Sequence, residues 1–311
     1  MRLLCPAKIN LHLRVGPRRD DGFHSLLSWF CTAGLFDTLT FEHFASPAEE
    51  PRPPISLVCD RADIPCDGRN LVVKVAVAWA QEVRNATGVS VGGIRASLQK
   101  RIPAGAGLGG GSSDGARALL GLNALWRTNR SADDLSEFAG RFGSDLPFFF
   151  HGPSNICTGR GENVRPLAKP SARWVLLILP PIHMPTADVY RRFDAMHLGR
   201  DEDISVEPTW ATWAKLDAKE LMEQLVNDLE PPAFAISPAL AALRQDIETA
   251  LAQPVRMSGS GSSLFTLYDT KKEATAAGGQ IEQLCERGQI EIVELAPEFK
   301  DDVSTQIDDR G

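Results

Sequence analysis

Ile-Pro-Ala-Gly-Ala-Gly-Leu-Gly-Gly-Gly-Ser-Ser-Asp, from Ile102 to Asp114, is the stretch of the chain that decides its fold. Its five glycines let the backbone adopt positive φ angles and approach a ligand closely, because no Cβ stands in the way. Apolar residues at helical spacing follow at once: Ala116, Leu119, Leu120, Leu122 and Leu125. A helix that begins behind such a loop points its unpaired N–H groups and the positive end of its dipole at whatever lies in front. The stretch therefore predicts a loop that binds nucleotide phosphates.

Other interpretations of this loop agree less well with the sequence. A flexible Gly/Ser linker is disfavoured because the run lies directly between a strand-like segment and a helix. A P-loop needs a lysine after its last glycine, and none follows Gly110. A dinucleotide fingerprint needs an acidic residue that closes a second strand, whereas Asp133 and Asp134 begin a polar helix start. The His-Arg-Asp and Asp-Phe-Gly triplets of protein kinases do not occur in the sequence.

The composition of the chain indicates a soluble, cytoplasmic protein. Its 311 residues, 43% of them hydrophobic, are enough for two domains that each have a core. No stretch approaches the roughly 18 apolar residues of a membrane span, and the N-terminus lacks the pattern of a secretory signal. A net charge of −7 disfavours binding to nucleic acid. The six cysteines have neither CxxC nor zinc spacing, which is typical of reduced, mostly buried thiols.

Hydrophobic periodicity predicts an α+β protein. Alternation of apolar and polar residues over 9–15 is the pattern of a half-buried strand. Further strands are expected at 26–32, 38–44, 55–59, 94–100, 174–179, 264–268 and 290–295. Helices are expected at 70–84, 112–126, 132–142, 186–197, 210–227, 238–251 and 271–286. Residues 46–54 are rich in Pro and Glu and predict an exposed loop.

Five motifs in order along the chain resemble one known superfamily. They are Pro-Ala-Lys-Ile-Asn-Leu at 6–11, Asp-Gly-Phe-His-Ser-Leu at 21–26, the Gly-rich run, Gly-Ser-Asp-Leu-Pro-Phe-Phe at 143–149 and Met-Ser-Gly-Ser-Gly-Ser-Ser at 257–263. This arrangement resembles the galactokinase, homoserine kinase, mevalonate kinase and phosphomevalonate kinase (GHMP) superfamily. Within it, the motifs look most like those of the kinases that act on 4-diphosphocytidyl-2-C-methyl-D-erythritol.

The resemblance implies a fold and an activity. The expected fold is the two-domain GHMP kinase fold, with a ribosomal-protein-S5-like N-terminal domain and a ferredoxin-like C-terminal domain. We expect these domains at 1–165 and 166–298, followed by a frayed tail at 299–311. The implied reaction uses ATP and Mg²⁺ to phosphorylate the 2-hydroxyl of the cytidine-diphosphate alcohol, in the non-mevalonate route to isoprenoid precursors. The alternatives are another small-alcohol kinase of the superfamily, of homoserine or mevalonate type, and a nonenzymatic nucleotide-binding regulator.

Two charged residues are the catalytic candidates that the resemblance implies. Asp145, in the Gly-x-Asp-x-Pro motif, would act on the acceptor hydroxyl, and Lys8, in Pro-Ala-Lys, would be its partner. A cation near a carboxylate keeps it ionised and able to accept a proton, and also stabilises charge on the transferring group. Without the motifs, Asp145 would be interpreted as a turn residue before Pro147, and Lys8 as a solvated charge at a strand end.

The resemblance also implies residues that bind the acceptor. Its cytosine would stack between Phe23 and Tyr190 and form hydrogen bonds with His24. Asn10 lies two residues after Lys8, so both side chains face the same side of a strand, and Asn10 is a candidate for the erythritol hydroxyls. A second close-approach loop near the point of transfer is expected at Gly259, Ser260 and Gly261. Core packing of the two aromatic rings, a strand-edge amide and an ordinary hairpin turn are the alternatives.

The Gly-rich loop contributes the candidates for binding ATP. They are Pro103, Ala104, Gly105, Ala106, Gly107, Leu108, Gly109, Gly110, Gly111, Ser112 and Ser113. Ser112 and Ser113 stand where a helix N-cap is expected, and a hydroxyl there is also a candidate for Mg²⁺ or a phosphate oxygen. Asp114 would lie in the first helical turn, where it either faces away from the triphosphate or helps to hold magnesium. The sequence does not identify the residues that bind the metal, and it allows either a monomer or a homodimer.

Several positions depart from the pattern of the resembled kinases. Alanine is common there where this chain has Gly115, Arg117 and Ser144, and tyrosine is usual where it has Phe23. None of these differences removes a charged catalytic group. Gly115 weakens the start of the helix by up to about 1 kcal/mol relative to alanine, and a stack on Phe23 does not depend on a phenol.

Overall fold

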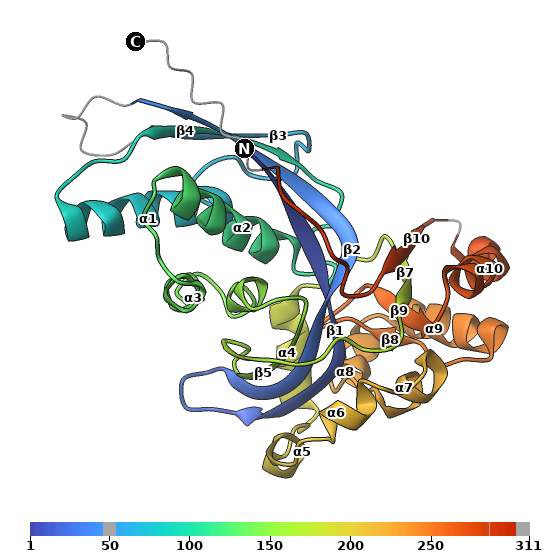
Figure 1. Cartoon of the computed structure of the whole chain (residues 1–311). Coiled ribbons are helices and arrows are strands. Elements are labelled where there is room, and N and C mark those ends of the chain that lie inside the picture. Colours follow the sequence, from blue (N-terminus) through green and yellow to red (C-terminus); the bar gives the residue numbers. More distant parts are fainter. Residues whose placement is uncertain (46–53, 286, 303–311) are drawn as a thin grey trace.

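The computed structural model describes residues 1–45, 54–285 and 287–302 of the chain. It contains two β-sheets, one from each half of the sequence, and helices pack against both of them (Figure 1). The α+β expectation is therefore confirmed. None of the helices in these described ranges is both long and apolar enough to cross a membrane.

The first half of the chain forms a six-stranded sheet. Its strands are β1 (Arg2–Arg18), β2 (His24–Phe44), β3 (Ile55–Cys59), β4 (Gly93–Gln99), β5 (Ser154–Gly159) and β6 (Asn163–Pro166). Their order is β3-β4-β2-β5-β6, and β1 pairs with β2. Helices α1 (Leu71–Thr87), α2 (Gly110–Leu125) and α3 (Ala132–Gly140) and the 3₁₀ helix η1 (Pro147–Phe150) belong to the same half. They bury a core against the sheet that includes Phe30, Trp79, Leu119 and Phe148.

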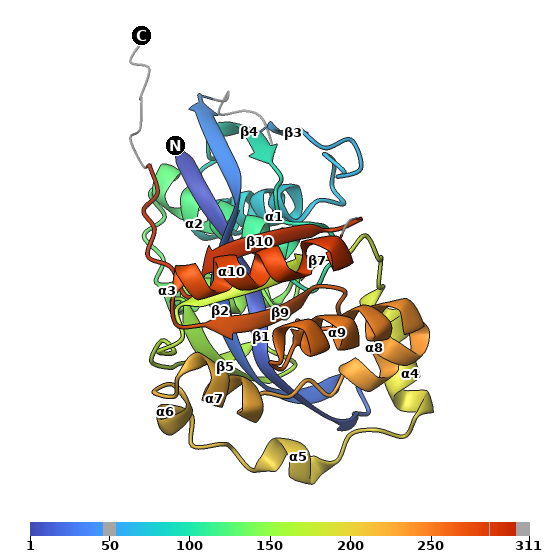
Figure 2. The ribbon, with the colours of Figure 1, turned by 90° about the vertical axis from the view of Figure 1, so that its right-hand side faces the viewer.

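The second half forms a four-stranded antiparallel sheet. Its strands are β7 (Trp174–Leu179), β8 (Arg256–Met257), β9 (Leu264–Tyr268) and β10 (Gln289–Glu294). Their spatial order, β10-β7-β9-β8, is the fourth, first, third and second strand of this half, as in a ferredoxin-like fold. The helices are α4 (Thr186–Ala195), α5 (Asp201–Ser205), α6 (Trp210–Trp213), α7 (Ala218–Gln224), α8 (Glu230–Ile236), α9 (Pro238–Leu251), α10 (Lys271–Ile281) and the 3₁₀ helix η2 (Glu282–Cys285). Figure 2 shows α9 and α10 over one face of this sheet.

Strands β1 and β2 differ from the expectation for them. β2 is one continuous strand, whereas the sequence predicted separate strands at 26–32 and 38–44. β1 is buried on both faces instead of half-buried, and its polar residues Lys8, Asn10 and His12 are only 3–4% exposed. The reason is that β1 runs between the two halves of the molecule, so its side chains enter the cores of both. This burial places polar side chains of β1 inside the molecule.

Other differences concern helix ends and the C-terminal segment. The single helix predicted over 210–227 is wrong, because α6 ends at Trp213 and the Asp217 side chain caps a new helix, α7, by accepting from Glu220 N. Helices α5 and α8 and strands β5, β6 and β8 were not predicted. Asp302 pairs with Arg2, so the expected tail begins as an ordered segment. Residues 46–53 of the expected exposed loop, residue 286 of the last helix and residues 303–311 lie outside the described residues.

Candidate active site

A cavity of about 1000 Å³ brings together most of the candidate residues. The Gly-rich loop, β1, the start of β2, α4 and the loop before β9 all contribute to its wall. The candidates that line it are Lys8, Asn10, Phe23, His24, Pro103, Ala104, Gly105, Ala106, Gly107, Gly109, Gly110, Gly111, Ser112, Asp145, Tyr190, Gly259 and Ser260. Leu108, Ser113 and Gly261 do not line it. Leu108 and Ser113 are buried behind the loop, and Gly261 lies against Met257.

The Gly-rich loop requires glycine at specific positions. Gly105, Gly107 and Gly109 have φ angles of 67°, 78° and 66°, which side-chain-bearing residues rarely adopt. A Cβ on Gly107 would lie 2.1 Å from the carbonyl oxygen of Ser258, and one on Gly109 would lie 2.8 Å from Cγ of Lys8. The loop therefore packs closely on the second half of the chain and on β1.

Helix α2 begins earlier than the sequence indicated. Its N-cap is Gly109, and no side chain caps it, so the expectation that Ser112 or Ser113 is the N-cap is wrong. Gly109 has a left-handed conformation and the helix begins directly after it, at Gly110, so both serines lie inside the first turn. The uncapped N–H groups of this first turn belong to the part of the helix that lines the cavity.

Lys8 and Asp145 lie side by side in the cavity. Lys8 Nζ is 3.3 Å from Asp145 Oδ2, and it donates a hydrogen bond of 2.7 Å to Asn10 Oδ1. The Lys8 side chain is 5% exposed and that of Asp145 is 34% exposed. The Asn10 amide in turn donates to Ser28 Oγ at 3.0 Å. The Lys8 ammonium is thus held by two oxygen acceptors, and the Asp145 carboxylate faces the open space.

The loop before β9 is held against β1 and the Gly-rich loop. Ser258 Oγ donates to the carbonyl of Gly107 at 2.9 Å, and Asn227 donates to the carbonyls of Met257 and Gly259. A Cβ on Gly259 would lie 3.1 Å from Asn10 Oδ1 and 3.6 Å from Lys8 Nζ. Gly259 therefore lets this loop approach the lysine closely. Asn227 and Ser258 were not among the sequence candidates, although Ser258 stands inside one of the quoted motifs.

The candidates for base binding gather at the other end of the cavity. The Phe23 ring is 50% exposed, and the Arg160 guanidinium lies 4.9 Å from its centroid. His24 is buried, and its ring centroid is 5.1 Å from that of Tyr190. Both nitrogens of His24 are occupied, Nδ1 by the carbonyl of Gly16 at 2.9 Å and Nε2 by Asp194 Oδ1 at 3.2 Å.

Arg160 and Asp194 are residues that sequence reasoning missed at this end. Both line the cavity. Asp194 lies one helical turn after Tyr190 on α4, so the helix that carries the ring also carries the partner of His24. Helical spacing from Tyr190 would have indicated Asp194, whereas no motif in the sequence indicates Arg160.

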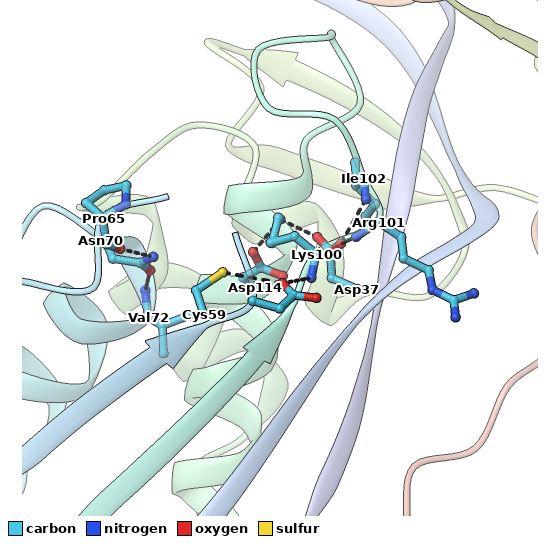
Figure 3. Close-up of polar contacts among 10 residues, drawn as sticks. Asp37, Cys59, Pro65, Asn70, Val72, Lys100, Arg101, Ile102 and Asp114 are labelled. Atoms are coloured by element: carbon cyan, nitrogen blue, oxygen red, sulfur yellow. Dashed lines mark hydrogen bonds and ion pairs between the residues drawn. The ribbon is translucent and has the colours of Figure 1, made fainter. Parts of the chain in front are cut away.

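A second charged cluster lies at the base of the Gly-rich loop (Figure 3). Lys100 donates hydrogen bonds to Asp37 and, at 2.7 Å, to Asp114, and all three side chains are at most 5% exposed. Asp114 is thus held by Lys100 at the base of the loop, and both residues also line the cavity. Lys100 and Asp37 were not among the sequence candidates, because 63 residues separate them and only the pairing of β2 with β4 brings them together.

Comparisons with known proteins agree with this arrangement. The family model described as GHMP kinases N terminal domain matches residues 70–153, and the one described as GHMP kinases C terminal matches residues 213–287. A 4-diphosphocytidyl-2-C-methyl-D-erythritol kinase of Prochlorococcus marinus (strain MIT 9303) is 38% identical over 288 residues, which cover 88% of this chain and 85% of that protein. One of Bacillus pumilus (strain SAFR-032) is 36% identical and covers 87% and 90%.

Solved structures show the same likeness. A crystal structure of 4-(cytidine 5'-diphospho)-2C-methyl-D-erythritol kinase has a TM-score of 0.74 and 34% identity, and covers 96% of this chain and all of that one. A homoserine kinase from Cytophaga hutchinsonii has a TM-score of 0.66 at 15% identity, with 94% of each chain covered, and shows the shared fold alone. The chain thus belongs to the GHMP kinases and, within them, to the 4-diphosphocytidyl-2-C-methyl-D-erythritol kinase family. It is an ATP-dependent small-molecule kinase with the two-domain GHMP fold.

Proposed function

We propose that the protein transfers the γ-phosphoryl group of ATP to the 2-hydroxyl of 4-diphosphocytidyl-2-C-methyl-D-erythritol, giving the 2-phosphate and ADP. The observation that carries this proposal is that one cavity joins the Gly-rich loop, the Lys8–Asp145 pair and the aromatic group of Phe23 and Tyr190. A phosphoryl transfer needs a bound triphosphate, a positioned hydroxyl and compensation of charge at the transferring group. The Gly-rich loop supplies the first, Asp145 and the aromatic group supply the second by positioning the acceptor, and Lys8 supplies the third.

The Lys8–Asp145 pair acts at the centre of the cavity. The acceptor hydroxyl oxygen forms a bond to the γ-phosphorus, its proton passes to the Asp145 carboxylate, and the bond from the γ-phosphorus to the bridging oxygen breaks to release ADP. Lys8 pairs with the neighbouring carboxylate and stabilises the negative charge of the transferring group. Its hydrogen bond to Asn10 fixes the position of the ammonium. Asn10 and the loop at Gly259 and Ser260 border the pair and contact the erythritol part of the acceptor.

The triphosphate binds along the Gly-rich loop and the first turn of α2. Backbone N–H groups and the positive end of the helix dipole face that part of the cavity. Mg²⁺ prefers oxygen ligands and keeps several waters, so few protein groups would be needed to hold it. The Ser112 hydroxyl and Asp145 are oxygen donors that line the cavity and would hold it there. The ion would supply positive charge that offsets the charge of the phosphates.

The cytosine of the acceptor binds between Phe23 and Tyr190. An exposed ring on one side and a half-buried ring on the other offer two faces for a base, and each stacking contact contributes roughly 1–3 kcal/mol. Homoserine and mevalonate have no base, so this end of the cavity favours the cytidine-diphosphate alcohol over those acceptors. The further expectations of a cytoplasmic monomer or homodimer that binds no nucleic acid, with a domain boundary at 165/166, belong to the same proposal.

The test uses purified protein with ATP, Mg²⁺ and one acceptor at a time, and follows the release of ADP. We expect turnover with 4-diphosphocytidyl-2-C-methyl-D-erythritol and background release with homoserine and mevalonate. Phosphorus NMR of the product should place the new phosphate on the 2-hydroxyl. Turnover of homoserine or mevalonate alone would overturn the choice of acceptor, and ATP binding without turnover of any acceptor would favour a regulator.

A further inference from the structure

The Gly-rich loop has two ends, and a buried lysine joins them. Lys100 follows β4 on the strand side of the loop, and Asp114 lies on α2 on the helix side. Lys100 Nζ donates to Asp114 Oδ2 at 2.7 Å, and the two side chains are 5% and 4% exposed. Figure 3 shows the two side chains pointing toward each other beneath the loop. The contact therefore spans the base of the loop that the proposed function assigns to the triphosphate.

On the strand side, backbone and side-chain contacts fix Lys100. Asp37, which is fully buried, accepts hydrogen bonds from Arg101 N at 2.6 Å and Ile102 N at 2.9 Å, and also from the Lys100 ammonium. Lys100 N donates to Asp60 Oδ1 at 2.9 Å. Asp37 therefore holds the chain at the point where it enters the loop, and directs the ammonium of Lys100 toward α2.

On the helix side, the Lys100–Asp114 contact adjoins the first turn of α2. A Cβ on Gly110 would lie 3.3 Å from Lys100 Nζ, so the ammonium lies directly against the residue at which the helix begins. Asp114 is one turn further along the helix and is buried. Its second oxygen, Oδ1, is also buried and has no hydrogen-bond partner among residues 1–45, 54–285 and 287–302. Lys100 is thus the donor that holds this carboxyl in place.

The loop between these two ends needs an external constraint. Three of its glycines adopt positive φ angles, and glycine-rich backbone loses much conformational freedom when it is held in one shape. Phosphate binding by backbone N–H groups is strong only when those groups already point at the ligand. We propose that Lys100 and Asp114 form a loop clasp, a positioning pair that fixes the separation of the two loop ends and so preorganises the triphosphate site.

The charges of the cluster favour a clasp over direct binding of phosphate by Lys100. Two carboxylates already surround one ammonium, so Lys100 has little positive charge left to offer a phosphate. The contact is a hydrogen bond of 2.7 Å from the ammonium to one carboxyl oxygen of Asp114. The amide oxygen of an asparagine could accept the same bond.

The test compares Asp114→Ala, which removes the acceptor, with Asp114→Asn, which keeps one. We measure the affinity of the full-length protein for ATP and for adenosine by calorimetry, after a check of the fold by circular dichroism. Loss of one hydrogen bond to a charged group should weaken ATP binding by about tenfold in Asp114→Ala. Asp114→Asn should bind ATP like the parent, and adenosine binding should be unchanged in both. Asp246→Asn, an exposed carboxylate change on α9, serves as the control.

Several outcomes would overturn the clasp. Parental ATP affinity in Asp114→Ala would do so, and so would equal losses for ATP and adenosine, because these indicate a general structural role. A large loss in Lys100→Met with none in Asp114→Ala would identify Lys100 as a direct phosphate ligand. If Asp114→Ala does not fold, Asp114→Ser keeps a polar atom in the buried position but lacks the reach of the carboxyl. The inference rests on ATP binding at the Gly-rich loop and not on the acceptor, so it can fail while the proposed acceptor stands.

Discussion

The molecule contains two lysine–aspartate groups on either side of the same loop, and they differ in burial and in partners. Asp145 is 34% exposed and faces the cavity, and its Oδ2 atom lies 3.3 Å from Lys8 Nζ. Asp37 and Asp114, beside Lys100, are 0% and 4% exposed. Lys8 has one carboxylate and one amide oxygen as partners, whereas Lys100 has two carboxylates.

This difference in burial separates a carboxylate suited to catalysis from carboxylates that stabilise the fold. A carboxylate that exchanges a proton with a substrate must reach the cavity and must tolerate a change of charge. A carboxylate that accepts several buried hydrogen bonds contributes to the fold, and its removal leaves donors unpaired. We therefore expect substitution of Asp145 to reduce turnover and substitution of Asp37 to reduce stability, although both carboxylates lie beside a lysine. Mutations can test this separation directly.

The largest effect is expected from Asp145→Asn. The asparagine keeps the shape of the side chain but cannot accept the hydroxyl proton, so kcat should fall by about 100- to 10,000-fold. Lys8 keeps Asn10 as an acceptor, so the free energy of unfolding should change by less than about 1 kcal/mol. Turnover and urea unfolding are measured on the same preparation, with ATP affinity as the control. Activity within tenfold of the parent would remove Asp145 from its proposed role.

Asp37→Ala should mainly lower the free energy of unfolding, in contrast to Asp145→Asn. This change leaves Arg101 N, Ile102 N and part of the Lys100 charge without their acceptor inside the protein. Breaking such a buried group should lower the free energy of unfolding by about 3–5 kcal/mol. The matched change Asp246→Ala, at an exposed position on α9, should have little effect on urea unfolding. If both variants unfold alike, the buried cluster does not support the fold and the comparison is wrong.

Phe23→Ala tests a third kind of effect, a loss of acceptor binding, because Phe23 belongs to the aromatic group and to neither lysine–aspartate group. Loss of one stacking face should weaken binding of the cytidine-diphosphate alcohol by roughly 1–3 kcal/mol, seen as a higher KM for that acceptor. The KM for ATP should not change, because Phe23 lies at the end away from the Gly-rich loop. Phe23→Tyr keeps the ring and should behave like the parent. A KM that rises for ATP instead of the acceptor would place the base elsewhere.

The sequence predicted those parts of the site that lie within motifs. Lys8 and Asn10 share a face because strand periodicity places residues two apart on one side, and the structure joins them at 2.7 Å. Asp145 was placed beside Lys8 through the resemblance alone, since 137 residues separate them and neither strand nor helix periodicity reaches so far. The predicted roles of these residues stay predictions until the variants are measured.

The sequence did not predict contacts that depend on register and on loop geometry. Asp37 meets Lys100 only because Thr38 of β2 pairs with Gln99 of β4. Helix α2 begins at Gly110, directly after Gly109 in its left-handed conformation, and five glycines in this stretch allow several starting points that the sequence does not distinguish. His24 meets Asp194 only because α4 packs beside the start of β2. In each case the missing information was which long-range pairing the chain adopts.

A third buried polar group, His12, should give the smallest effect at neutral pH, because its contribution to stability changes only as the pH falls. Its ring lies edge-on to Trp210 and Trp213, and burial, together with the nearby Arg14, lowers its pKa to about 3. In the unfolded chain the pKa returns to its ordinary value of 6.5, so the unfolded state binds a proton first as the pH falls. The stability that a neutral His12 provides is complete above pH 6.5 and is lost between pH 6.5 and about 3, by up to about 1.4 kcal/mol for each pH unit.

Urea unfolding between pH 7 and pH 5 measures this loss. The free energy of unfolding should fall less steeply with pH in His12→Gln, which keeps a polar side chain but does not titrate. An equal decline in parent and variant would show that His12 takes up its proton in the folded protein, and that the aromatic surroundings of His12 do not require a neutral ring.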